Sequence, residues 1–205
     1  MKVKGERMKV AIFDRMEECT DSAVEKMLPL VSDQRREQAL RYRHTLGRFC
    51  CLKSWIMWRE QLITCLKPAE NLQKNPTGNW TWTYNEHGKP YLPSGPYFSI
   101  SHCKAAIAVA VDEKPIGIDV ESIRHADPDL IARTMNEEEQ RQIHEAKERD
   151  RAFTRLWTQK EAVVKAEGIG IVSFEQLQSL LPENKAYRLE TIEKEKYIYS
   201  IAYKQ

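Results

Sequence analysis

The chain has 205 residues, of which 41% are hydrophobic and 30% charged, enough for a packed core in one domain or two small halves. A net charge of +2 is too small by itself to indicate a nucleic-acid-binding protein. Five cysteines without a C-x-x-C pair or a secretory leader indicate a reduced, cytoplasmic protein. No apolar run approaches the length of a membrane span, so no membrane partner is expected.

The first part of the chain is predicted to be a strand followed by helices. Ser32 or Asp33 has the side chain of an N-cap residue at the start of a basic helix, and Gly47 is expected to interrupt that helix. A wide apolar face characterises the helix after it. The predicted elements are a strand over 8–13, a helix over 22–30, a basic helix from 32 through 43, and a longer helix from 48 to about 65.

The middle of the chain has the patterns of short strands and turns. Residues 105–111 are a continuous apolar run, which is typical of a strand buried on both faces. Residues 112–115 are a turn, and 116–121 form another short strand. The other predicted elements are a strand over 80–84, a hairpin turn at 86–88 with a return over 89–92, and a strand over 97–101.

The last part of the chain is predicted to be mainly helical before it ends in strands. Asn136 opens one helix with a capping-box pattern. A longer helix is expected from about 149 to Gly168, with strands near 187–189 and 197–203. Helices with a sheet are therefore followed by helices with a sheet, which predicts an α+β fold of two halves, residues 1–112 and 113–205.

Three carboxylates carry the main chemical signal. Asp119 and Glu121 are two apart on a predicted strand, so they share one face, and like charges so close need a cation between them. Mg²⁺ is the simplest such cation, with Glu161 either as a third ligand or in contact with the metal through water. On the long helix Glu161 lies in one row with Trp157 and Lys165. The alternative is a pair of solvated acids and an ordinary surface ion pair.

Basic side chains on both parts of the chain fit a phosphate-rich substrate. Arginine suits bidentate phosphate contacts, whereas lysine acts as a point charge. Each residue taken alone is also compatible with a solvated surface position or, for the histidine, a structural hydrogen bond. The candidates are Arg35, Arg36, Arg41, Arg43, Arg48, Lys89, His102, Lys160 and Lys165.

Four motifs together resemble the 4'-phosphopantetheinyl transferase superfamily. The G-I-D-V-E sequence at 117–121 is followed, after 35 residues, by W-T-Q-K-E-A-V-V-K at 157–165. F-S-I-S-H-C at 98–103 resembles the family's F-N-x-S-H-S element, and G-K-P at 88–90 resembles its G-K-P turn. The motifs are in family order, and the length is similar to that of the monomeric type that activates surfactin synthetase.

The resemblance implies a fold, a reaction and partners. The fold is a pair of pseudo-twofold-related α+β halves with coenzyme A in the cleft between them. The reaction is Mg²⁺-dependent transfer of the 4'-phosphopantetheine arm of coenzyme A to a serine hydroxyl, releasing 3',5'-ADP. The acceptor is an apo acyl carrier protein or peptidyl carrier domain, which is expected to be acidic and helical. The enzyme is expected to be a cytoplasmic monomer without a nucleic-acid or membrane partner.

The resemblance also assigns roles to particular residues. Asp119, Glu121 and Glu161 look like the magnesium ligands, and Glu161 is the favoured base for the carrier serine, directly or through water. The catalytic group is thus expected to comprise Glu161, Asp119 and Lys165. The residues expected to bind coenzyme A, mainly through its phosphates, are Arg35, Arg48, Lys89, Ser101, His102, Lys160 and Lys165.

Some positions depart from the family pattern. Ser99 stands where asparagine is usual, and Cys103 stands where a second serine is usual. The segment from Tyr42 to Arg48 is shorter than in relatives, so the assignment of Arg48 to the 3'-phosphate depends on where the gap falls. Glu139 matches a further family acid, although its capping box already gives it a structural role.

Two other functions use the same residues. A magnesium-dependent phosphodiesterase or nuclease would use the same carboxylates, but the motif at 157–165 gives it no special support. A non-catalytic nucleic-acid-binding module would use the arginine-rich helix, and it predicts a larger basic excess and strong salt dependence.

Overall fold

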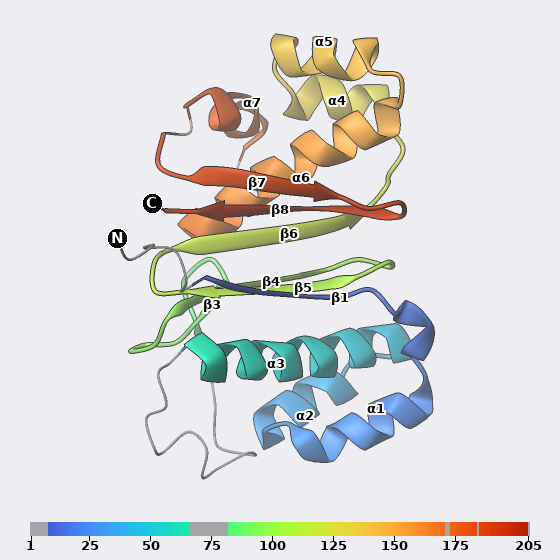
Figure 1. Ribbon diagram of the computed structural model, residues 1–205, viewed down its shortest axis with the longest axis vertical. Helices are drawn as coiled ribbons and strands as arrows, with labels where there is room; N and C mark the ends of the chain where they lie inside the picture. The colour runs from blue at the N-terminus through green and yellow to red at the C-terminus, as the bar shows by residue number, and fades with distance from the viewer. Residues whose placement is uncertain (1–7, 66–81, 171–172, 184, 205) are drawn as a thin grey trace, which may run out of the picture.

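The computed structural model describes residues 8–65, 82–170, 173–183 and 185–204. Two three-stranded antiparallel sheets lie at the centre, with helices outside them (Figure 1). The fold is therefore α+β, as predicted. In the described part of the chain, no helix is both long and apolar enough to cross a membrane.

The first sheet has the strand order β1-β5-β4, and helices α1 to α3 lie on one side of it (Figure 1). Residues 80–81 of the strand predicted over 80–84 lie outside the described residues. The elements are β1 (Lys9–Phe13), α1 (Asp21–Met27), α2 (Asp33–Leu40), α3 (Thr45–Cys65), β2 (Thr83–Tyr84), β3 (Pro90–Tyr91), β4 (Tyr97–His102) and β5 (Ile107–Asp112), with 3₁₀ turns at Met16–Glu18 and Leu28–Leu30.

The break between α2 and α3 corrects the prediction about Gly47. Ser32 caps α2 by accepting a hydrogen bond from the Arg35 backbone N–H at 3.3 Å, and α2 ends at Leu40. Gly47 lies inside α3, where a Cβ atom would come within 2.6 Å of the Tyr42 ring. The glycine therefore makes room for that ring, and the helical break falls earlier, at residues 41–44.

The second sheet has the strand order β6-β8-β7, and α6 packs against it. In each sheet the strand that comes last in the sequence lies in the middle, between the first and the second. The two sheets therefore have the same topology. The elements are β6 (Ile116–Ser122), α4 (Pro128–Thr134), α5 (Glu137–Glu145), α6 (Arg149–Glu167), α7 (Phe174–Glu183), β7 (Arg188–Glu193) and β8 (Tyr197–Tyr203). The predicted division between residues 112 and 113 falls at the end of β5, where the turn to β6 begins, and it stays a prediction.

Gly117 determines how closely β6 approaches α6. A Cβ atom at Gly117 would lie 2.0 Å from the Ala162 carbonyl oxygen and 2.4 Å from the Ala166 nitrogen, so only glycine fits there. Asp119 follows two residues later on the same strand. The close approach therefore brings the acidic end of β6 against the helix that carries Glu161 and Lys165.

The edge strands of the two sheets meet through β4 and β6. Ile118 of β6 donates its backbone N–H to the Ser99 hydroxyl oxygen of β4 at 3.1 Å. Nearby, the Tyr197 hydroxyl donates to Asp14 at 2.9 Å. Fully buried alanines of β5 pack in the same cluster as Ile116 and Ile118. These contacts hold β4 and β6 side by side, and the candidate site forms at their ends.

Candidate active site

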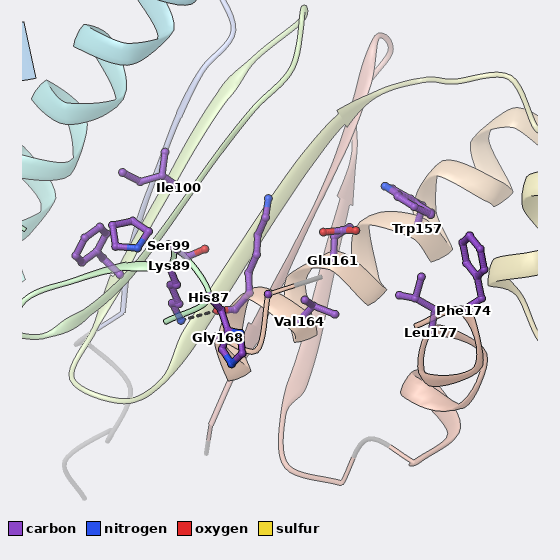
Figure 2. Close-up of a pocket in the computed structure, with 15 residues that line it drawn as sticks. His87, Lys89, Ser99, Ile100, Trp157, Glu161, Val164, Gly168, Phe174 and Leu177 are labelled. Atoms are coloured by element: carbon purple, nitrogen blue, oxygen red, sulfur yellow. Dashed lines mark hydrogen bonds between the residues drawn. The ribbon is translucent and has the colours of Figure 1, made fainter. Parts of the chain in front are cut away.

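One face of α6 lines two adjoining pockets. Trp157, Glu161 and Lys165 border both of them, which places the three residues along one row, as the helical spacing predicts. Figure 2 shows Trp157, Glu161 and Val164 projecting from α6, with Lys89 and residues of β4 on one side and Phe174 and Leu177 on the other. The helix therefore presents its carboxylate and its ammonium to a shared space.

The first pocket, of about 420 Å³, is polar and contains most of the predicted site. It brings together the carboxylates of Asp119, Glu121 and Glu161 with Lys165. The other residues that line it are Arg35, Tyr42, Cys51, Ser54, Ile100, Ser101, His102 and Trp157. Residues from five separate predicted motifs or helices thus converge on one space.

Asp119 lies at the centre of a small hydrogen-bonded network. The Lys165 ammonium is 2.6 Å from Asp119 Oδ1, and the Ser101 hydroxyl donates to the same oxygen at 2.8 Å. Lys165 also donates to Ser101 at 3.0 Å. The Asp119 side chain is only 3% exposed, and its second oxygen, Oδ2, is buried without a hydrogen-bond partner.

The neighbouring carboxylates are held in an environment that disfavours their charge. Burial raises the pKa of Glu121 and of Glu161, and the negative charge of Asp119 raises both further. Lys165 and Arg124 act in the opposite direction on both groups. Three acids that repel one another in a half-buried pocket form a site that an added cation would stabilise.

The donor set fits Mg²⁺ by its chemistry. All three groups are hard oxygen donors, and the unpartnered Asp119 Oδ2 offers an oxygen to a cation. Among residues 8–65, 82–170, 173–183 and 185–204, however, no three acidic, histidine or cysteine side chains are arranged closely enough to hold a metal ion. The side chains of Asp119, Glu121 and Glu161 would therefore have to move together around a metal.

The second pocket, of about 470 Å³, has a mainly apolar lining that includes Phe98, Ile100, Val164, Phe174 and Leu177. Two of these side chains, Phe174 and Leu177, come from α7, a helix without a motif from which this pocket could have been predicted. The pocket opens beside the carboxylates because Glu161 and Lys165 border both spaces. It has the shape and polarity for an uncharged chain attached to a polar group in the first pocket.

Lys89 reaches this second pocket from the β2–β3 turn. Its ammonium donates to the backbone oxygens of Lys165 and of Ala166, the latter at 3.3 Å, near the C-terminal end of α6. Burial lowers the pKa of Lys89 to about 8. The Asn85 side-chain amide donates to the Gly168 oxygen at 2.8 Å in the same region. The turn therefore caps the helix that carries Glu161, in addition to lining the pocket.

Arg35 lines the first pocket, but much of its guanidinium is engaged by the protein. It donates to the Cys51 backbone oxygen at 2.9 Å, to Gln38 at 2.8 Å and to Ser54 at 3.1 Å. The guanidinium also lies 4.8 Å from the centre of the Trp82 ring. Burial lowers the pKa of Arg35. Three of its five N–H donors thus hold the surrounding helices in place.

The structure corrects the expected position of Lys160 and gives Arg48 a hydrogen-bond partner within the protein. Lys160 is fully buried and faces away from both pockets, because its ammonium pairs with Glu139 at 2.9 Å and donates to the Leu177 backbone oxygen. Arg48 lines neither pocket and donates to the Tyr42 backbone oxygen at 2.9 Å. The Lys160 ammonium thus lies in the core. Arg48 supports the turn between α2 and α3, and its predicted contact with the 3'-phosphate stays a prediction.

Arg124 is a site residue that the sequence patterns did not identify. Its guanidinium lies 5.1 Å from the centre of the Trp157 ring, and its charge lowers the pKa of both Glu121 and Glu161. The only sequence feature that could have indicated Arg124 is its position three residues after Glu121, just beyond the end of β6. Arg124 fixes the Trp157 ring and moderates the acidic pocket.

Comparison with known proteins gives one consistent family. Residues 115–204 match the 4'-phosphopantetheinyl transferase superfamily. The chain is 33% identical over 152 residues to a 4'-phosphopantetheinyl transferase of Bacillus subtilis, covering 72% of this chain and 64% of the relative. It is 28% identical to the 4'-phosphopantetheinyl transferase gsp of Aneurinibacillus migulanus, covering 69% and 57%.

A further relative is the 4'-phosphopantetheinyl transferase AcpT of Salmonella typhimurium, which is 30% identical over 63% of this chain and 66% of its own length. The match to the first two relatives spans less than two thirds of their lengths. The three proteins nonetheless share one named activity, and the family region contains β6 and α6, which supply the three carboxylates and Lys165 of the acidic pocket. Residues 115–204, which carry β6 and α6, thus match the 4'-phosphopantetheinyl transferase superfamily, and the wider chain is similar to 4'-phosphopantetheinyl transferases over about two thirds of its length.

Proposed function

We propose that this protein transfers the 4'-phosphopantetheine group of coenzyme A to a serine hydroxyl of an apo carrier protein and releases 3',5'-ADP. The observation that carries the proposal is the convergence of Asp119 and Glu121 of β6 with Glu161 and Lys165 of α6 in one pocket. The apolar pocket beside it supports the same reaction, because it suits the pantetheine arm. The relatives' shared name agrees with this chemistry.

The residues divide the work of this reaction. Burial and the Asp119 charge raise the pKa of Glu161, which makes its carboxylate a stronger base for the serine proton. The serine oxygen then bonds to the phosphorus of the pantetheine arm, and the bond from that phosphorus to the 3',5'-ADP oxygen breaks. Mg²⁺ held by Asp119, Glu121 and Glu161 would neutralise part of the diphosphate charge. Lys165 and His102 line the space where the phosphates would lie.

The first test is a transfer assay with several classes of carrier. Purified protein is incubated with Mg²⁺, coenzyme A and apo carriers from fatty-acid, polyketide and peptide synthesis, and the carriers are examined by mass spectrometry. One added phosphopantetheine per carrier is the expected result. No mass gain on any class would overturn the proposal. Degradation of coenzyme A or of nucleic acid without a modified carrier would favour the phosphodiesterase alternative.

The proposed carrier would dock on the turn between α2 and α3, at the rim of the acidic pocket. Three large apolar side chains are exposed there, Leu40, Tyr42 and Leu46. Arg41 and Arg43 are exposed between them, and Tyr42 also lines the pocket. Apolar groups interleaved with arginines fit an acidic helical partner, and this surface would place its serine near Glu161.

Reversing both arginine charges, with Arg41→Glu and Arg43→Glu together, is expected to raise KM for the carrier about tenfold while kcat changes little. Rim charges act mainly on association, and about 1.4 kcal/mol of lost attraction corresponds to a factor of ten. Steady-state kinetics with varied carrier concentration provide the measurement. Lys194→Glu with Lys196→Glu, on the exposed turn between β7 and β8, is the matched control. An equal rise in both double variants would contradict docking at this turn.

A monomeric state and a cytoplasmic location belong to the same proposal. All five cysteines are free thiols, which suits a reducing compartment. Two α+β units within one chain line both pockets without a contribution from a second copy. A molar mass measured by light scattering that corresponds to two chains would contradict the monomer.

A further inference from the structure

Lys165 holds one of the two carboxylate oxygens of Asp119, and the other oxygen, Oδ2, has no hydrogen-bond partner. Its ammonium lies 2.6 Å from Asp119 Oδ1, and the same ammonium donates to Ser101 at 3.0 Å. The Asp119 side chain is almost fully buried, so its charge requires a partner. Ser101 supplies only a neutral hydrogen bond to this oxygen. Lys165 is therefore the main counter-charge of Asp119 when no metal is bound.

The arrangement of the other acids shows that the metal site is not preformed. The three carboxylates share a pocket, yet within the described ranges they are not grouped closely enough to hold an ion. A divalent cation bound to Asp119 would lie within a few ångströms of the Lys165 ammonium if the lysine stayed in place. Two positive charges at such a separation in a half-buried site repel strongly. Ammonium and metal therefore compete for the charge of this carboxylate, even where each approaches a different oxygen.

We propose that Lys165 is an internal stand-in for the metal, and that its ammonium competes with a divalent cation for Asp119 and moves away when the cation binds. This inference rests on the proposed function, because the phosphates that Lys165 would bind are those of coenzyme A. It assigns Lys165 a role in the metal-free protein that differs from phosphate binding. The displacement links the two roles, since the ammonium that leaves Asp119 becomes available to the substrate phosphates.

The surroundings of Lys165 permit this movement. Its side chain is 30% exposed and borders both pockets, so the ammonium can turn into open space without unfolding the helix. Its backbone is held in place, because Lys89 donates to the Lys165 backbone oxygen. The backbone of Asp119, by contrast, is fixed on β6 by pairing with β8 and by the packing of α6 against the strand. On the lysine's side, the exchange therefore requires only a rotation of its side chain, while the carboxylates close around the metal.

The test measures binding of Mn²⁺ alone, by the electron paramagnetic resonance signal of the free ion, without coenzyme A or carrier. Lys165→Gln is expected to bind Mn²⁺ about tenfold more tightly than the unmodified protein, a coupling typical of two competing ligands. Lys165→Arg keeps a cation at this position and is expected to bind Mn²⁺ as weakly as the unmodified protein. Circular dichroism of each variant confirms that it is folded.

Arg155→Gln is the matched control, because it removes one positive charge from the same helix at a residue that lines neither pocket. A gain in Lys165→Gln no larger than in Arg155→Gln would overturn the inference, as would an equal gain in Lys165→Arg. The result is separable from the transfer assay. Tighter Mn²⁺ binding without carrier modification would retain the inference on the metal site and remove the proposed transferase function.

Discussion

Replacing Asp119 by Asn is expected to lower the rate of carrier modification by at least about 10²–10³-fold, the size of effect seen when a preorganised electrostatic group is removed from an active site. Asn preserves the shape of the side chain and can still accept a hydrogen bond from Ser101. It lacks the charge that pairs with Lys165 at 2.6 Å and that would hold a cation. Mass spectrometry of the carrier over time, at saturating coenzyme A, gives the rate.

Asp129→Asn provides the control for this prediction, because Asp129 is an exposed acid at the start of α4. It changes the net charge by the same amount and is expected to leave the rate unchanged. Urea unfolding of both variants separates a loss of folded protein from a loss of chemistry. A near-normal rate for Asp119→Asn in folded protein would remove the carboxylate cluster from the mechanism.

The sequence patterns predicted the α+β class and most strands because their signals are local. The buried strand β5 follows from an uninterrupted apolar run, and α5 follows from its capping box, which the structure confirms at Asn136 and Glu139. The prediction that Gly47 interrupts a helix was wrong. Gly47 lies within α3 and makes room for the ring of Tyr42, and helix propensity says nothing about such a contact. Tertiary packing decided that boundary.

The part of the site that could be predicted is the part whose side chains are placed on one face of a strand or helix by a sequence motif. Asp119, Glu121, Glu161 and Lys165 share a pocket because strand and helix periodicity determine which way each points. Lys160, one residue before Glu161, points instead into the core. Its burial could not be predicted, because the partner that makes it possible, Glu139, comes from a different helix. The apolar pocket was likewise hidden, since its lining comes from segments without a motif.

Removing the charge of Glu139, by Glu139→Gln, is expected to lower the free energy of unfolding by about 3–5 kcal/mol, the usual cost of breaking a buried ion pair. Glu139 and Lys160 are 2.9 Å apart, and their side chains are 5% and 0% exposed. Gln can still accept the hydrogen bond from the Asn136 backbone that closes the capping box. The cost therefore comes from leaving the Lys160 ammonium buried without a counter-charge. Urea unfolding measures it.

The double variant Glu139→Gln with Lys160→Met separates a structural role of Lys160 from a role in binding coenzyme A. Met fills a similar volume without a charge, so the double variant is expected to recover most of the lost stability. Because Lys160 faces away from both pockets, coenzyme A binding to the double variant, measured by calorimetry with Mg²⁺, is expected to match that of the unmodified protein. If the folded double variant bound coenzyme A tenfold more weakly, the result would support the original assignment of Lys160 to phosphate binding. Equal affinity would leave it as the buried cation that ties α6 to α5 behind the catalytic face.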